Sequence, residues 1–249
     1  MTSLCTICTT IMLAGSGRIR LLQQALRSYE QTTPIHNHAI IVVIDNEKLV
    51  NAVYACMRSS LSNYRRKNYL FSATLLGQLG ALRNSAARMA QTVYRPEYIH
   101  FVDDDVYFRK GWLKQLYSTI TLDWRVAIVG GDRHPYHKPN KVMNTKGEWV
   151  SSVGSFEQTD AVAGYSMFML ASTFTALGGF PTEGKSIGAS EDWALCQKAR
   201  RMGKLVGYCT ARPVLHCGLT NSNGQPATGA DQILANKPTD EDVKGVIYE

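Results

Sequence analysis

The sequence lacks long hydrophobic runs. Of its 249 residues, 45% are hydrophobic and 19% are charged, yet no uncharged apolar stretch approaches the ~20 residues that a membrane-spanning helix needs. Residues 4–14 are the one candidate for the core of a signal sequence, but no cationic segment precedes them. We therefore expect no membrane span, and we interpret residues 4–12 as a core strand.

Cysteine is scarce as well, and the six cysteines form no framework. Most of them lie in apolar segments, where a free thiol packs as a small hydrophobic group, so a reducing compartment is favoured over disulfide bonding. Cys5 and Cys8 have the spacing of half a zinc site, but no second pair matches it, and structural zinc is the weaker interpretation. We expect a cytoplasmic protein, with a peripheral position at a membrane surface as the alternative.

Acidic residues are outnumbered, 20 against 27 basic ones, which gives a formal charge of +7. This excess favours an anionic partner such as a nucleotide, an anionic lipid headgroup or a nucleic acid. A basic module that binds nucleic acid or membrane without catalysis is therefore one hypothesis.

Apolar residues alternate between strand and helix periodicity along the chain, with no internal repeat, which predicts an α/β fold with a mostly parallel central sheet flanked by helices. We expect strands at 4–12, 38–44, 69–73, 98–102, 126–129, 161–170 and 205–208, and helices at 19–29, 50–60, 82–93, 112–120 and 191–202. A short helix is expected between the strand at 161–170 and Leu177, and residues 213–217 form an apolar setting for His216. The aperiodic residues 133–155 predict a loop near the substrate or a small antiparallel excursion.

Three consecutive carboxylates, Asp103, Asp104 and Asp105, follow the predicted strand at 98–102. Strands of an open α/β sheet carry ligand sites at their carboxyl ends. In extended backbone, Asp103 and Asp105 would point to one side and could share a hard cation. The alternative is a solvated turn or a helix N-cap before residues 112–120.

Several further motifs follow in a fixed order. They are Ile44-Asp45, Leu82-Arg83-Asn84, the aspartate triplet, Gly111-Trp112-Leu113, Ala163-Gly164-Tyr165, Gly178-Gly179-Phe180, Ser190-Glu191-Asp192-Trp193 and Leu215-His216. In this order they resemble the family 2 glycosyltransferases of the GT-A fold over residues 5–218. The resemblance implies a single GT-A domain at 1–218, with a nucleotide- and metal-binding half at 1–108 and an acceptor-binding half at 109–218, followed by a polar tail at 219–249.

The resemblance also implies a metal site at the aspartate triplet. Asp105 would bind the ion directly. Asp103 would either contact the ion through a water molecule or hold the ribose of the nucleotide. His216 would complete the set of metal ligands. Carboxylate, phosphate and one imidazole suit Mn²⁺ or Mg²⁺. For His216 the alternative is a buried core histidine, and a second metal site at His134 and His137 is weaker than a substrate loop there.

The remaining roles are assigned in the same way. Asp192 is expected to be the general base that removes the proton of the acceptor hydroxyl. Trp193 could stack on an acceptor sugar, and Glu191 could orient its loop or cap its helix. The full expected sets are Thr9, Thr10, Asp45, Arg83, Asp103 and Asp104 for the nucleotide, and Gly164, Glu191 and Trp193 for the acceptor.

The expected function is inverting, metal-dependent transfer of one sugar from a UDP- or dTDP-type donor to a hydroxyl acceptor. That acceptor would be a glycan, a glycolipid or another hydroxyl compound, including an anionic one, and nucleic acid would enter only as an acceptor. The alternatives are a sugar nucleotidyltransferase and the binding module without catalysis. The chain has no Gln-x-x-Arg-Trp segment, which argues against a processive synthase.

Overall fold

The computed structural model of the chain describes residues 8–14, 19–33, 38–44, 46–61, 68–72, 79–132, 142–143, 149–150, 152–182 and 191–217. Several features expected from the sequence lie outside these ranges, among them Cys5, Asp45, His134, His137 and the tail at 219–249.

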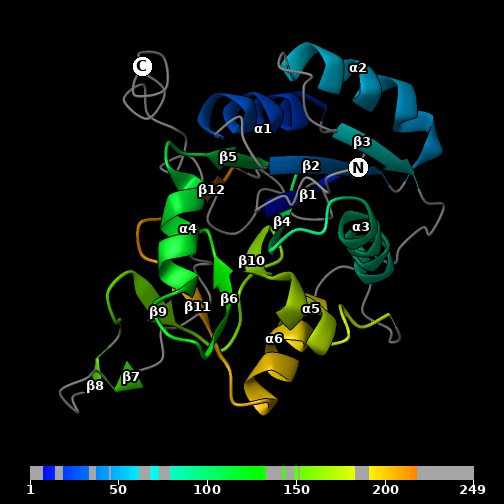
Figure 1. Ribbon diagram of the computed structural model, residues 1–249. Helices are drawn as coiled ribbons and strands as arrows, with labels where there is room; N and C mark the ends of the chain where they lie inside the picture. Colours follow the sequence, from blue (N-terminus) through cyan, green and yellow to red (C-terminus); the bar gives the residue numbers. More distant parts are fainter. Residues whose placement is uncertain are drawn as a thin grey trace, which may run out of the picture.

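Strands and helices alternate in the first half of the chain, as predicted (Figure 1). Helix α1 forms because Leu22, Leu26 and Tyr29 recur at helical spacing and bury one face against the sheet. The elements are β1 Cys8–Ala14, α1 Ile19–Thr32, β2 His38–Ile44, η1 Glu47–Leu49, α2 Val50–Ser60, β3 Asn68–Ser72, α3 Leu79–Val93 and β4 Tyr98–Asp103.

Among the described residues, the second half of the chain contains short strands and three helices. Its elements are β5 Val106–Phe108, α4 Trp112–Ile120, β6 Val126–Gly130, β7 Val142–Met143, β8 Trp149–Val150, β9 Phe156–Gln158, β10 Ser166–Leu170, α5 Ala171–Ala176, α6 Glu191–Arg201, β11 Leu205–Cys209 and β12 Val214–His216. The antiparallel pair β7–β8 lies in the segment where the sequence predicted a loop or an antiparallel excursion. Strand β9 was not predicted.

The central sheet has eight strands among the described residues, in the order β3-β2-β1-β4-β10-β6-β11-β9. The pairs β3–β2, β2–β1, β1–β4 and β6–β11 are parallel. Strands β10 and β9 run antiparallel to their neighbours. The predicted class, an α/β domain with a mostly parallel central sheet, is confirmed.

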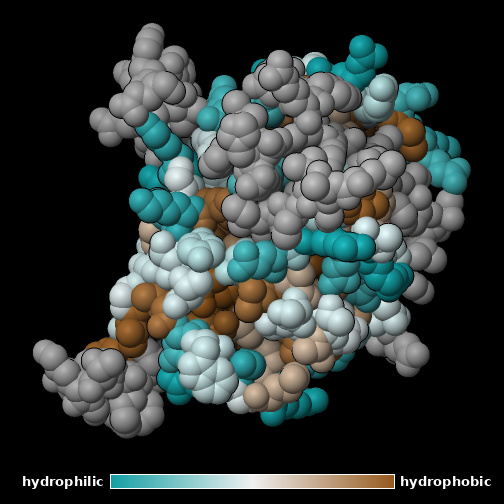
Figure 2. Space-filling model, in the orientation of Figure 1, coloured by the Kyte–Doolittle hydropathy of each residue, from teal (hydrophilic) through white to brown (hydrophobic). Residues whose placement is uncertain are grey.

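Helices cover both faces of this sheet. Residues alternate along β2: Ile40 and Val42 belong to the core cluster that includes buried residues of α1, α2 and α4, whereas Ile41 and Val43 belong to the cluster that includes buried residues of α3, α5 and α6. Because both faces are buried, β2 is apolar from Ala39 to Ile44, which is why it reads as a continuous hydrophobic run after His38. On the outer surface, hydrophobic atoms gather below the middle of the face shown in Figure 2, over the region of β6 and β9, and hydrophilic atoms lie beside α3.

The prediction for the aspartate run was wrong in one respect. Extended backbone was expected through Asp105, but β4 ends at Asp103, and Asp104 and Asp105 form a turn. The chain then enters β5, which leaves the central sheet and pairs with β12. The turn therefore separates Asp103 from Asp105, and the two belong to different local environments.

The strand predicted at 161–170 is also shorter than expected. Only Ser166–Leu170 is β10, and residues 161–165 have no regular structure. Small residues at 161–164 look compatible with a strand, but the backbone amides of 162–164 bond to side chains instead of to a neighbouring strand, as described below.

The five cysteines in the described part of the chain (Cys8, Cys56, Cys196, Cys209 and Cys217) are free thiols. Four of them are buried, as predicted for small hydrophobic groups. None of the described helices is both long and apolar enough to cross a bilayer.

Candidate active site

The candidate site begins where β4 ends. Asp103 is the last residue of β4 and pairs in register with Leu13 near the end of β1, so it lies at the carboxyl edge of the parallel strands. Its backbone N–H donates to Tyr165 O at 3.3 Å. This edge is where an open α/β sheet offers a ligand crevice.

The turn after Asp103 brings Asp105 to His216. Strands β5 and β12 pair so that Val106 lies opposite His216, and the Asp105 carboxylate is 3.4 Å from His216 Nε2. Cys217 N donates to Asp105 O at 2.6 Å and ties the end of β12 to the same turn. The structure therefore brings together two of the three predicted metal ligands.

The three aspartates differ in burial. Asp104 is 0% exposed and Asp105 3%, whereas the side chain of Asp103 is 26% exposed. The alternative of a solvated turn is therefore wrong for Asp104 and Asp105, and the N-cap of α4 is Gly111 rather than an aspartate.

His216 is held on several sides. Its ring stacks on Tyr165, with centroids 4.2 Å apart and planes 5° apart, and its backbone N–H donates to Asp132 Oδ2 at 3.1 Å. Burial lowers the pKa of His216. The hydrogen bond and charge of Asp105, together with the charges of Asp103 and Asp132, raise this pKa by a larger amount, so that it lies above its usual value.

Asp132 is a residue of this site that the sequence analysis missed. It is 2% exposed, follows β6 and accepts from Arg212 Nε as well as from His216 N, while its carbonyl accepts from the Tyr165 hydroxyl at 3.1 Å. Burial is the main reason that the pKa of Tyr165 lies well above its usual value, so this hydroxyl stays protonated and donates. The available signal was an aspartate shortly after an apolar strand, separated from Val129 by Gly130 and Gly131, a pattern similar to the one that identified Asp103.

The irregular segment at 162–164 is fixed by side chains from α6 and β11. Its three successive amides each donate to a different acceptor: Val162 to Cys196 Sγ at 3.3 Å, Ala163 to Tyr208 Oη at 3.0 Å, and Gly164 to Asp192 Oδ2 at 2.8 Å. Because each of these three N–H groups has a side-chain acceptor, the segment needs no hydrogen bonds to a neighbouring strand.

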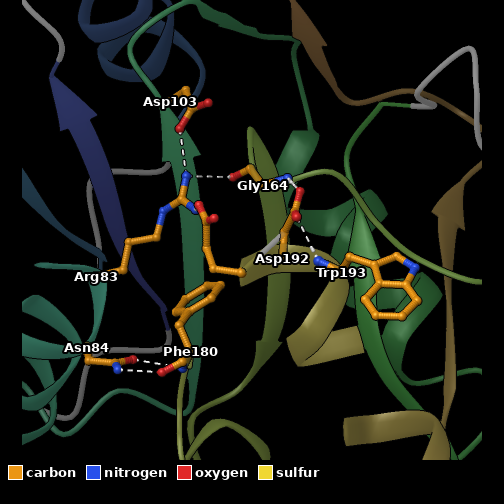
Figure 3. Close-up of polar contacts among 8 residues, drawn as sticks. Arg83, Asn84, Asp103, Gly164, Phe180, Asp192 and Trp193 are labelled. Atoms are coloured by element: carbon orange, nitrogen blue, oxygen red, sulfur yellow. Dashed lines mark hydrogen bonds and ion pairs between the residues drawn. The ribbon is translucent and has the colours of Figure 1, made fainter. Parts of the chain in front are cut away.

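Asp192, the predicted base, lies in the first turn of α6. Its Oδ2 accepts from Gly164 N, and its Oδ1 accepts from Trp193 N at 2.7 Å. A carboxylate offers about four acceptor positions, so two hydrogen bonds leave room for a hydroxyl donor. The Trp193 indole points away from Asp192 and Arg83 in Figure 3, and 53% of Trp193 is exposed.

Arg83 connects the two sides of the site (Figure 3). It projects from α3 and is 3% exposed. Its Nη2 lies 2.8 Å from Asp103 Oδ1 and 3.3 Å from Gly164 O, and its Nη1 lies 3.1 Å from Glu191 Oε1. The guanidinium also lies over the Phe180 ring, 5.4 Å from its centroid.

The adjacent Asn84 secures the loop that follows α5. Its side-chain amide donates to Phe180 O and accepts from Phe180 N, both at 2.8 Å. A side chain at Gly179 would meet Asn84, and φ of 72° at this position favours glycine. The Arg-Asn pair thus positions parts of the second half of the chain.

The prediction for Thr9 and Thr10 placed them at the end of the first strand, and this was wrong. They lie at the amino end of β1, are buried, and pair with Ile99 and His100 of β4, whereas the carboxyl edge is at Asp103. At about 3.3 Å per residue, Thr9 is roughly 13 Å along the strand from that edge. The pairing with β2 and β4 on both sides also engages their backbone.

A divalent cation fits the donor set at the turn. Among the described residues, no three His, Cys, Asp or Glu side chains are gathered into a protein-only metal cage. Asp105 and His216 are nevertheless adjacent, and Mg²⁺-type ions are commonly held by one or two carboxylates together with substrate phosphates. The site is therefore compatible with an ion that is completed by a bound diphosphate.

Several solved structures share this fold. The structure of GalNAc-T7 with UDP, GalNAc and Mn²⁺ superposes with a TM-score of 0.60 at 16% identity, covering 85% of this chain and 43% of that one. The mannosyltransferase PcManGT from Pyrobaculum calidifontis, in complex with GDP-Man and Mn²⁺, gives 0.56 at 16% identity, with 80% and 56% covered. TarS 1-349 of S. aureus in complex with UDP-GlcNAc gives 0.54 at 16% identity, with 81% and 56% covered.

The chain thus spans about half the length of these neighbours, and at such identities the similarity concerns the fold. No curated protein sequence matches the chain. The sequence profile of glycosyl transferase family 2 matches residues 18–177, which include Arg83, the aspartate triplet, Asp132 and Gly164. Because this profile covers more than half of the chain, the protein belongs to glycosyl transferase family 2.

Proposed function

We propose that this protein transfers a single sugar from a nucleoside diphosphate sugar to a hydroxyl acceptor, with inversion at the anomeric carbon and with a divalent cation bound. One observation carries the proposal: the adjacent residues Gly164 and Tyr165 contact both candidate centres. Gly164 N bonds to Asp192, and Tyr165 stacks on His216, which lies beside Asp105.

Asp105 and His216 would hold the cation, Mn²⁺ or Mg²⁺, and Asp103 would contribute through water or bind the ribose. When bound, such an ion supplies Lewis-acid neutralisation of the diphosphate leaving group. The pairing of β5 with β12 keeps Asp105 and His216 together, and burial of Asp105 excludes water from one side of the pair. The neighbours solved with Mn²⁺ support this assignment.

Asp192 would be the general base. Two backbone N–H groups orient its carboxylate, and a remaining acceptor position takes the proton of the acceptor hydroxyl as the oxygen attacks the anomeric carbon. The bond to the diphosphate breaks on the opposite face, so direct displacement inverts the configuration. A base held by backbone amides changes little in position during the reaction, and this preorganisation favours catalysis.

The donor would be of the UDP or dTDP type, with Asp45 and Asp103 on the nucleotide side. UDP, UDP-GlcNAc and GDP-Man are bound in the fold neighbours, which supports a nucleotide sugar as the donor. Asp104 is completely buried, so Asp103 is the more accessible of the two for a ribose contact.

The acceptor would approach across Gly164 and the first turn of α6. The exposed indole of Trp193 offers a flat apolar surface of the kind that stacks on sugar rings. Glu191 is engaged with Arg83, so its role on the acceptor side is to hold α6 in place.

Thermal-shift measurements with nucleotides and nucleotide sugars, with and without Mn²⁺, test the binding part of the proposal. A ligand at about 100 times its Kd stabilises the folded state by about 2.7 kcal/mol, which a melting curve resolves. The best donor would then be incubated with glycan and glycolipid acceptors, and the anomeric configuration of the product read by NMR. Absence of any metal-dependent stabilisation, or a product with retained configuration, would contradict the proposal.

A further inference from the structure

Arg83 is a buried cation between two anions that come from distant parts of the chain. Asp103 ends β4, and Glu191 begins α6. The side chains of Arg83, Asp103 and Glu191 are 3%, 26% and 12% exposed, so these ion pairs are screened far less than pairs on the surface.

Gly164 completes the same junction. Its carbonyl accepts from Arg83 Nη2, and its amide donates to Asp192 Oδ2. A β-carbon at this position would lie 3.0 Å from Arg83 Nη1, so a glycine allows the guanidinium to approach this closely. Arg83 therefore reaches Asp192 by two routes, one through Gly164 and the other through Glu191, its neighbour in sequence.

We propose that Arg83 is a positioning residue that holds the base Asp192 in place relative to Asp103, by bridging Asp103, Gly164 and Glu191. This inference rests on the proposed function, since it assigns Arg83 to the geometry of that reaction. It differs from the direct nucleotide contact expected from the sequence, because the two Nη atoms of Arg83 are already engaged with three protein acceptors.

The bridge needs the shape of arginine. A guanidinium presents five donors in a planar fork, so it can bind two carboxylates and a carbonyl at once, whereas the single ammonium of lysine cannot span the same acceptors with equal geometry. An error of about 1 Å in the placement of a catalytic group can cost roughly 100-fold in rate. Loss of the bridge should therefore reduce kcat more than it affects donor binding.

Steady-state kinetics of four variants test this step. Arg83→Met should lower kcat about 100-fold with the donor KM changed less than about threefold, and Arg83→Lys should lower kcat about tenfold. Glu191→Gln keeps one acceptor oxygen and leaves Arg83 in place, and should lower kcat about tenfold with the fold retained. Arg88→Met is the control, because Arg88 is exposed on the same helix and bonds to Ser85.

Hydrogen–deuterium exchange provides a readout that does not depend on turnover. The amides of residues 162–165 should exchange faster in Arg83→Met and Glu191→Gln than in the wild type, and Arg88→Met should match the wild type. If the wild type transfers no sugar and binds no nucleotide, the proposed function fails, while this exchange experiment still decides whether Arg83 orders Gly164.

Three results would overturn the inference. The first is wild-type kcat in Arg83→Met, and the second is unchanged exchange at 162–165. The third is a tenfold or larger loss of affinity for UDP and Mn²⁺ in both Arg83 variants with kcat retained, because that pattern identifies Arg83 as a direct phosphate ligand.

Discussion

The two sides of the candidate site are held in different ways. Asp105 and His216 are positioned by backbone pairing of β5 with β12 and by the Tyr165 ring. Asp192 is positioned by hydrogen bonds and ion pairs that pass through Arg83, Glu191 and Gly164. The first arrangement depends mainly on strands and stacking, and the second on charged side chains, so mutations should separate the functions of the two sides.

The largest effect is expected on the Asp192 side. Asp192→Asn keeps the size of the side chain and an oxygen that can accept from Gly164, but it removes the carboxylate of the proposed base. We expect kcat to fall about 1,000-fold, in the range typical of general-base catalysis. Binding of UDP with Mn²⁺, measured by calorimetry, should stay within about twofold of the wild type.

The control for this variant is Asn84→Asp, which changes an amide of similar size on α3 that bonds to the Phe180 loop, away from the proposed chemistry, and should affect folding stability first. Wild-type turnover in Asp192→Asn would remove the proposed base, and a parallel loss of nucleotide binding would show that the two sides are not independent.

The opposite pattern is expected for Asp105→Asn. Replacing a charged ligand by a neutral one should weaken Mn²⁺-dependent binding of UDP about 100-fold, and kcat at saturating Mn²⁺ should recover in part. Titration of Mn²⁺ by electron paramagnetic resonance measures the affinity directly. Unchanged Mn²⁺ affinity would place the cation elsewhere.

The same contrast explains what the sequence could predict. The bounds of β2 and α2 were predicted to the residue. The apolar run of β2 reflects burial on both faces, and the helical spacing of α2 reflects burial on one face. Asp105 and His216 were placed together through motif order, and the structure confirms that they are adjacent. The sequence thus predicted most of the fold and one side of the site.

The contacts that join the two sides could not be predicted in this way. Arg83 and Glu191 are 108 positions apart, and Asp132 meets Arg212 and His216 only after β6 and β12 have folded. Periodicity describes local burial and carries no information about which distant side chains share a hydrogen bond. Thr9 and Thr10 were misplaced for a related reason, since strand ends are weakly encoded and β1 continues to Ala14.

The next prediction concerns His100, a buried residue of β4, the strand that ends at Asp103. It lies within β4, is 0% exposed, stacks on Trp112 and bonds through Nε2 to Ser166 Oγ, which also accepts from Gly131 N. Burial lowers the pKa of His100 to about 3. Below pH 6.5 the unfolded chain gains a proton at His100 that the folded state does not, so the free energy of unfolding should fall by about 2 kcal/mol between pH 7.5 and 5 through this residue.

The measurement is urea denaturation at several pH values for the wild type and His100→Gln. The variant should be less stable at pH 7.5, because the stacking on Trp112 is lost, but its stability should depend less steeply on pH below 6.5. Equal slopes for the two proteins would show that His100 is protonated in the folded state.

The smallest effect is expected from Tyr165, which touches both sides. Tyr165→Leu removes the ring that stacks on His216 and should weaken Mn²⁺-dependent binding of UDP about fivefold, since an aromatic pair contributes about 1 kcal/mol. Tyr165→Phe keeps the ring, loses the hydrogen bond to Asp132 O, and should bind within about twofold of the wild type. Calorimetry of UDP with Mn²⁺ compares the two variants. A loss confined to kcat in Tyr165→Leu would instead mean that this residue acts mainly through Gly164 and Asp192. Tyr165 would then belong to the side of the site that charged side chains position, and not to the side that strand pairing positions.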